Sequence, residues 1–90
     1  MRMLSILALL PAAAAALEIN TATRAQLEQL PGLGVATTER ILQARVERPF
    51  ADWKDLAARV SGIGGKRAER LDRQGLTVNG KALGDRGKRQ

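Results

Sequence analysis

The chain has 90 residues, which is enough for one small domain and too few for two. It contains no cysteine and no histidine, so disulfides, thiolate metal sites and histidine-based acid–base chemistry are excluded. Fifteen lysine and arginine residues against nine acidic residues give a formal charge of +6. Such a charge favours a polyanionic partner, which could be nucleic acid, an acidic lipid or another acidic polymer.

The N-terminal segment predicts a secretory signal peptide over residues 1–16. Arg2 supplies the positive charge, Leu4–Leu10 is apolar, and small residues ending at Ala16 fit a cleavage site before Leu17. A membrane anchor is the alternative interpretation. The apolar stretch is interrupted by a serine and a proline and is shorter than the roughly 20 residues of a spanning helix, so we expect no stable membrane anchor.

An internal repeat with an offset of 30 residues organises the rest of the chain. The segment Leu27–Gly34 matches the segment Ala57–Gly64 in its apolar positions and in a pair of glycines. Small and apolar positions beyond the glycines match as well, namely Thr38 with Ala68 and Ile41 with Leu71. A repeat of this length indicates one supersecondary unit used twice, and such small copies must pack on each other to bury their apolar faces.

The first copy predicts a helix, a short turn and a second helix. Thr23 and Gln26 have the spacing of a capping box, and a proline after Leu30 ends the first helix. Gly32 and Gly34 permit positive φ in a tight turn. The second helix is predicted over residues 35–48, and its small and apolar positions follow helical spacing: Val35, Thr38, Ile41, Leu42 and Val46.

The second copy repeats this pattern with a cap at Asp52. Its first helix has an apolar face formed by Trp53, Leu56, Ala57 and Val60. Gly62 and Gly64 form the turn, and the last helix is predicted from Gly65 to about Arg73, with Gly75 just beyond its end. The sequence thus predicts an all-α fold of four to five short helices. A short extended end over residues 76–78 packs back onto the core, and residues 79–90 are predicted to be a basic disordered tail.

Both turns have the features of an anion site. A turn of the form Gly-apolar-Gly that leads directly into a helix leaves N–H groups unpaired at the positive end of the helix dipole. Glycine also leaves no side chain between backbone and ligand, so phosphate oxygens can reach the amides of Gly34, Val35, Gly64 and Gly65. The central residues of the turns, Leu33 and Ile63, are expected to point into the core.

Cations follow the second turn directly. Lys66 and Arg67 lie in the first turn of the last helix, where positive charge opposes the dipole, so an anionic partner explains them better than stability does. The alternative is a solvated charged surface. Arg70 and Arg73 can extend this basic patch along the same helix. Three arginines of the other long helix have a weaker claim because acidic residues lie among them: Arg40, Arg45 and Arg48.

Three segments carry a family resemblance: Ile19–Thr23, Leu30–Gly34 and Val60–Gly64. Together with the joining segment Phe50–Leu56, they resemble the tandem helix-hairpin-helix domain of ComEA-type competence proteins. The resemblance implies an (HhH)2, SAM-like domain over residues 17–78. It also implies sequence-independent binding of double-stranded DNA, with one hairpin on each strand across the minor groove, and a periplasmic protein that retains incoming DNA during natural transformation.

The resemblance has one departure, at Thr37, where the family often has a lysine. The first hairpin is therefore expected to use its amides and the hydroxyls of Thr37 and Thr38, and the second hairpin is expected to contribute more. The predicted DNA contacts are Gly32, Gly34, Val35, Thr37, Thr38, Gly62, Gly64, Gly65, Lys66, Arg67 and Arg70. Trp53 and Phe50, the only aromatic residues, are expected to be structural and not to stack on bases.

Two other classes of function remain open at this stage. A helix-hairpin-helix pair can serve as a protein-interaction or structural module that does not bind DNA. The motif also occurs in DNA-processing enzymes, but the acidic residues are spread along the chain, and we expect no separate catalytic domain beside the repeat. We expect no catalysis, no cofactor, no metal and no small-molecule substrate, with DNA-uptake machinery as a possible protein partner.

Overall fold

The structure is a computed structural model that describes residues 16–84. Residues 1–15 of the predicted signal peptide and residues 85–90 of the predicted tail lie outside this range. In chain order the elements are β1 (Leu17–Glu18), α1 (Arg24–Glu28), α2 (Val35–Glu47), α3 (Trp53–Arg59), α4 (Gly65–Arg73) and β2 (Leu76–Thr77). No helix in the described range is long and apolar enough to cross a membrane.

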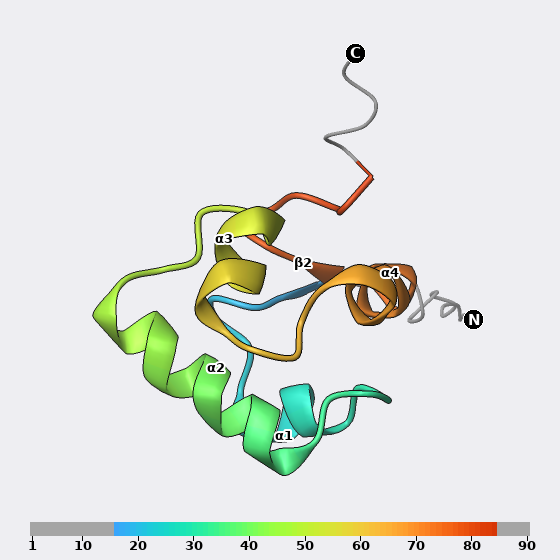
Figure 1. The fold of residues 1–90 in the computed structure, drawn as a ribbon. Coiled ribbons are helices and arrows are strands. Elements are labelled where there is room, and N and C mark those ends of the chain that lie inside the picture. Colours follow the sequence, from blue (N-terminus) through green and yellow to red (C-terminus); the bar gives the residue numbers. More distant parts are fainter. Residues whose placement is uncertain (1–15, 85–90) are drawn as a thin grey trace, which may run out of the picture.

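The two copies of the repeat are two helix–turn–helix units that pack together (Figure 1). The unit of α1 and α2 occupies the lower half of the view, and the unit of α3 and α4 occupies the upper half. The predicted all-α class is confirmed, with two very short strands added to the four helices of the described range.

Both predicted helix caps are present. The Thr23 hydroxyl accepts a hydrogen bond from the Gln26 amide at 3.1 Å, and the Gln26 side chain accepts one from the Thr23 amide at 2.9 Å. The Asp52 carboxylate accepts from the Asp55 amide at 2.8 Å. These bonds satisfy N–H groups that have no partner inside the helix, and they fix where α1 and α3 begin.

The two turns share the conformation of their first glycine and differ just after the second, where Gly65 has a φ of 53° and Val35 does not have a positive φ. Gly32 and Gly62 take φ values of 92° and 95°, a left-handed conformation that L side chains adopt at a cost. Gly34 and Gly64 are extended, with φ of −82° and −166°. Only the first glycine of each pair therefore uses the positive φ that the sequence permits at both, and the second glycine is not required by the turn.

The core lies between the two units and takes residues from all four described helices, from β2 and from the segments between them, with Leu17 of β1 packed against it. Leu33 and Ile63 are buried as predicted, and the matched pairs Thr38 with Ala68 and Ile41 with Leu71 are buried too. The buried apolar residues are Ile19, Ala22, Leu27, Leu33, Ile41, Phe50, Trp53, Leu56, Val60, Ile63, Ala68, Leu71, Leu76 and Val78. Each unit thus covers the apolar face of the other, as a repeat of this size requires.

Three residues assigned to apolar faces are not in the core. Val35 and Val46 are 68% and 82% exposed, and Ala57 is exposed. Val35 and Val46 lie in the first and last turns of α2, whose buried residues are Thr37, Thr38 and Ile41. The repeat matches Leu27 of α1 with Ala57 of α3, but the buried residue of α3 is Leu56, one position earlier. The buried face of α3 is therefore rotated by one residue relative to that of α1.

A parallel strand pair joins the two ends of the domain. Leu17 and Glu18 pair with Leu76 and Thr77, and the Leu17 amide donates to the Gly75 carbonyl at 2.9 Å. The prediction that residues 76–78 pack back onto the core is confirmed, since Leu76 and Val78 are buried. The sequence did not indicate β1 as their partner, because two-residue strands have too little pattern to be recognised.

The prediction of a disordered tail from residue 79 onward is wrong for residues 79–84. Val78 and Lys81 exchange two backbone hydrogen bonds of 3.0 Å across a turn at Asn79 and Gly80. The Trp53 indole donates to the Lys81 carbonyl at 3.0 Å, and the Leu83 amide donates to the Asp72 carboxylate at 2.8 Å. Composition alone predicted disorder, and these tertiary bonds outweigh it.

Candidate nucleic-acid interface

Each hairpin presents free backbone donors at the start of a helix. In the first hairpin, the N–H groups of Gly34, Val35 and Ala36 have no acceptor among the described residues. In the second, the same holds for Gly64 and Gly65 and for the next residue along α4. These donors lie at the positive ends of two helix dipoles, where an anion is stabilised.

The second glycine of each turn leaves these donors accessible. A Cβ atom built on Gly34 or Gly64 would have no atom within 4 Å, so neither packing nor backbone conformation requires glycine there. Glycine at these places does keep the backbone open to a ligand, because any other side chain would project from the turn. The predicted contact residues of the turns themselves are all exposed: Gly32, Gly34, Val35, Gly62, Gly64 and Gly65.

The threonines predicted to help the first hairpin do not face solvent. Thr38 is fully buried and Thr37 is 9% exposed. The Thr38 hydroxyl oxygen has no hydrogen-bond partner, which is the cost of placing threonine where the second copy has Ala68. The predicted hydroxyl contact of Thr38 with DNA is therefore wrong, and Thr37 has too little exposed surface to replace the lysine that the family often has. Among the groups predicted for the first hairpin, only its backbone amides remain available to bind a phosphate.

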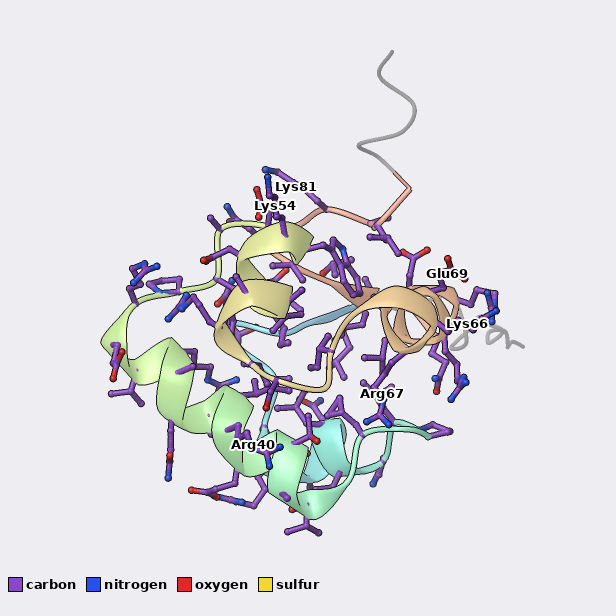
Figure 2. The ribbon with its side chains drawn as sticks, viewed as in Figure 1. Arg40, Lys54, Lys66, Arg67, Glu69 and Lys81 are labelled. Carbon is purple, nitrogen blue, oxygen red and sulfur yellow. The ribbon has the colours of Figure 1, made fainter. Side chains whose placement is uncertain are left out.

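The cations of α4 point in different directions (Figure 2). Arg67 projects toward the first unit, whereas Lys66 lies on the outer side of α4 near Glu69. Lys66 and Arg70 are exposed, Arg67 is half-buried, and none of the three forms an ion pair with a described residue. Lys66 and Arg67 were predicted to form one basic patch. Neighbouring residues on a helix point in directions about 100° apart, so the two side chains do not lie together.

The three arginines on and just after α2, which had the weaker claim to bind DNA, differ in their contacts with the rest of the protein. Arg45 donates to the carbonyl oxygens of Ile19 and Ala22 at 2.8 and 2.7 Å, which holds the N-terminal segment against α2. Arg48 lies 3.6 Å from the Asp55 carboxylate. Arg40 is exposed and forms no ion pair within the described range, so it remains available to a ligand.

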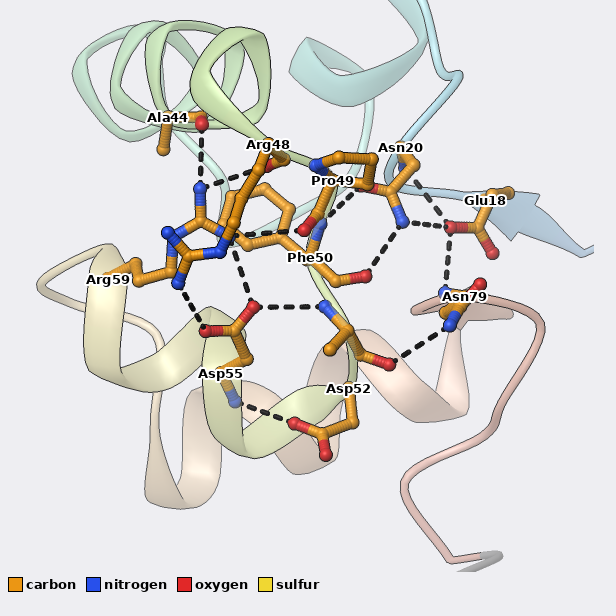
Figure 3. Close-up of polar contacts among 11 residues, drawn as sticks. Glu18, Asn20, Ala44, Arg48, Pro49, Phe50, Asp52, Asp55, Arg59 and Asn79 are labelled. Carbon is orange, nitrogen blue, oxygen red and sulfur yellow. Dashed lines mark hydrogen bonds and ion pairs between the residues drawn. The ribbon is translucent and has the colours of Figure 1, made fainter.

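An arginine that sequence reasoning missed holds the two units together (Figure 3). Arg59 donates to the backbone carbonyls of Ala44, Arg48 and Pro49 and pairs with Asp55 at 3.1 Å. Its guanidinium also lies 4.5 Å from the centre of the Phe50 ring. These contacts cap the end of α2 and fix α3 beside it, and no local pattern around Arg59 marks this role.

Asn20 fixes the same linker from the other side. Its side chain accepts from the Phe50 amide at 2.7 Å and donates to the Phe50 carbonyl at 3.0 Å. The Glu18 carboxylate beside it accepts hydrogen bonds from Asn20, Thr77, Asn79 and Gly80. Desolvation acts to raise the pKa of Glu18, but these bonds together outweigh it and the pKa lies below its ordinary value.

The described residues contain no cluster of three or more metal-ligating side chains. The two hairpins present backbone donors and cations, and these groups suit phosphate oxygens. Both hairpins, their spacing and their buried central residues define a tandem helix-hairpin-helix protein.

Comparison with known proteins agrees with this class. Residues 12–74 match a family described as "Helix-hairpin-helix motif", and the chain belongs to that family. Motifs of this family commonly bind DNA, which supports nucleic-acid binding in general. Neither the curated proteins nor the solved structures contain a match to the chain.

Proposed function

We propose that this protein binds double-stranded DNA without sequence preference and without catalysis, through the phosphate backbone. The observation that carries the proposal is the pair of hairpins, each with an open glycine and free amides at a helix start. Family membership points to nucleic acid, and the unpaired side chains of Lys66, Arg67 and Arg70 favour a polyanion.

The absence of base readout follows from what the hairpins offer. Trp53 and Phe50 are 4% and 0% exposed, so neither aromatic ring can stack on a base. Amides and cations directed at phosphates carry no sequence information. A duplex holds its phosphates at fixed spacing, so two rigid hairpins suit it better than a flexible single strand.

We place this activity in the periplasm, as retention of incoming DNA during natural transformation. The support is the predicted signal peptide over residues 1–16 together with the resemblance to ComEA-type competence proteins. A DNA-uptake protein is the partner class that this role implies.

Charge reversal at the second hairpin tests the proposal. Lys66→Glu with Arg67→Glu should weaken binding to a labelled mixed-sequence duplex about a hundredfold at ~0.1 M salt, because two cations become anions beside phosphate. The matched control compares the single variants Arg67→Glu and Lys81→Glu, which make the same charge change, the second at an exposed residue that lies away from Arg67 (Figure 2).

The Lys81→Glu variant should lose much less affinity than the Arg67→Glu variant. Equal losses in the two variants would show that only net charge matters, and would refute a hairpin-based site. No binding by the unsubstituted protein at low salt would also refute the proposal, and would favour a structural or protein-interaction role.

A further inference from the structure

Two arginines occupy equivalent places in the two copies and differ in number by the repeat offset of 30. They are Arg40 on α2 and Arg70 on α4, and both are exposed and without an ion pair among the described residues. In each copy this arginine lies six residues after the second glycine of the turn, so it is one and a half helical turns from its own hairpin amides. The packing of the two units therefore determines which hairpin lies nearest to each arginine.

Arg70 reaches the first hairpin. A Cβ atom on Gly32 would lie 3.8 Å from Nη1 of Arg70 and 3.9 Å from its Cδ, so the arginine side chain runs alongside the turn of the other unit. One helical turn further on, the Gln74 side chain donates to the Pro31 carbonyl at 3.1 Å. The face of α4 that carries Arg70 is thereby held against the first hairpin.

Arg40 faces the second unit at a greater distance, since a Cβ atom on Gly62 would meet no atom within 4 Å. It lines an open groove of about 720 Å³ between α2 and the end of α3, and the opposite wall of that groove includes Ser61, the residue before Gly62. Figure 2 shows Arg40 on α2, the helix of the first unit. A cation of the first unit therefore lines the groove that reaches the start of the second hairpin, whereas Arg70 of the second unit lies directly alongside the first hairpin.

We propose that Arg40 and Arg70 are exchanged phosphate contacts: each supplies a cation to the DNA strand held by the hairpin of the other unit. This inference rests on the proposed DNA binding and assigns the missing cation of the first hairpin, where Thr37 cannot serve. The duplex is then gripped at each hairpin by amides from one unit and an arginine from the other.

Coupling between variants tests the exchange. Gly34→Ala and Gly64→Ala each place a methyl group over one set of amides without disturbing the fold, since the new Cβ meets nothing within 4 Å. Each glycine variant, Arg40→Gln and Arg70→Gln should separately weaken duplex binding about tenfold. Each double variant is then compared with the product of its single effects.

The exchange predicts a crossed pattern. Arg70→Gln added to Gly34→Ala should cost much less than a further tenfold, because both changes damage one phosphate site, whereas Arg70→Gln added to Gly64→Ala should be fully multiplicative. Arg40→Gln should couple to Gly64→Ala and be multiplicative with Gly34→Ala. Arg70→Lys should restore most of the affinity, and Arg73→Gln is the matched control on α4.

Three results would overturn the inference. They are coupling of each arginine to the hairpin of its own unit, multiplicative effects in all four pairs, and unchanged affinity of the two arginine variants. Thermal unfolding followed by circular dichroism identifies any loss caused by misfolding, and a variant with lowered stability but unchanged affinity counts against the exchange. Absence of binding by the unsubstituted protein would refute the proposed function itself, and the inference with it.

Discussion

The two hairpins have the same turn but different charges. Gly32 and Gly62 share nearly the same φ, and Leu33 and Ile63 are equally buried. The second hairpin continues into Lys66 and Arg67, whereas the first continues into Ala36 and Thr37, of which the second is buried. The local sequence of each copy thus determines the conformation of its turn, but it does not determine the charge that surrounds the turn.

The difference teaches that a repeat can be locally unequal and still form a balanced site. Arg70 lies along the first hairpin, so part of the charge that the local sequence lacks is supplied by packing. The Cβ environment of Gly32 is the observation that reveals this, and nothing in residues 30–38 indicates it. Substitutions at the turn glycines and at the start of α2 can each alter one hairpin separately, and a substitution at Glu18 alters neither.

The four turn glycines should fall into two classes. Gly32→Ala and Gly62→Ala should each lower the free energy of unfolding by about 1–2 kcal/mol, because alanine at positive φ is strained. Gly34→Ala and Gly64→Ala should leave stability within about 0.5 kcal/mol and weaken DNA binding about tenfold. Urea unfolding and duplex titration on all four variants separate the classes. Similar stability losses in all four would contradict the assignment of Gly34 and Gly64 to ligand access.

A lysine can be added to the first hairpin to make it resemble the second. Ala36→Lys corresponds to Lys66 and replaces an exposed residue. It should strengthen duplex binding about fivefold, since a cation near an anionic surface contributes about 1 kcal/mol. The log–log salt slope should also become steeper by about 0.9 if the lysine neutralises one phosphate. Unchanged affinity would mean that the start of α2 does not face DNA.

The smallest effect on binding is expected at Glu18, whose hydrogen bonds join the two ends of the domain and involve no residue of either hairpin. Its pKa in the folded protein lies below the ordinary value of 4.5, so its carboxylate stabilises the fold above about pH 4.5. This contribution should be lost as the pH falls through the folded-state pKa. Glu18→Gln should lower stability by about 1 kcal/mol at pH 7, flatten the acid limb of the stability profile and leave duplex affinity unchanged. A steep acid limb in the variant would assign the pH dependence to other carboxylates.

The sequence predicted the features that depend on local chemistry. Capping residues, the turn glycines and the 30-residue repeat are set by short-range patterns, and the four helices begin within a residue of the predicted positions. It failed where tertiary packing decides the outcome. The hydroxyl of Thr38 was assigned a DNA contact that its burial excludes, Arg59 is charged but holds the linker, and residues 79–84 were predicted to be disordered but are bound by Trp53 and Asp72.

The candidate site shows the same division. The amides of both hairpins could be identified from the glycine pairs, because a helix start leaves donors unpaired in any context. The angle between Lys66 and Arg67 follows from helical spacing, but which of the two faces the first unit, and the approach of Arg70 to Gly32, depend on how one unit lies against the other. Sequence spacing alone does not contain that information.

The central claim is that both hairpins bind duplex phosphates without reading bases. Its most direct test is the affinity of the protein for several duplexes of unrelated sequence and for the matching single strands, each titrated over a range of salt concentrations. The account predicts nearly equal affinities among the duplexes, weaker binding to the single strands and a log–log salt slope of about −4 to −5. A strong preference for one sequence, or binding that does not respond to salt, would contradict it.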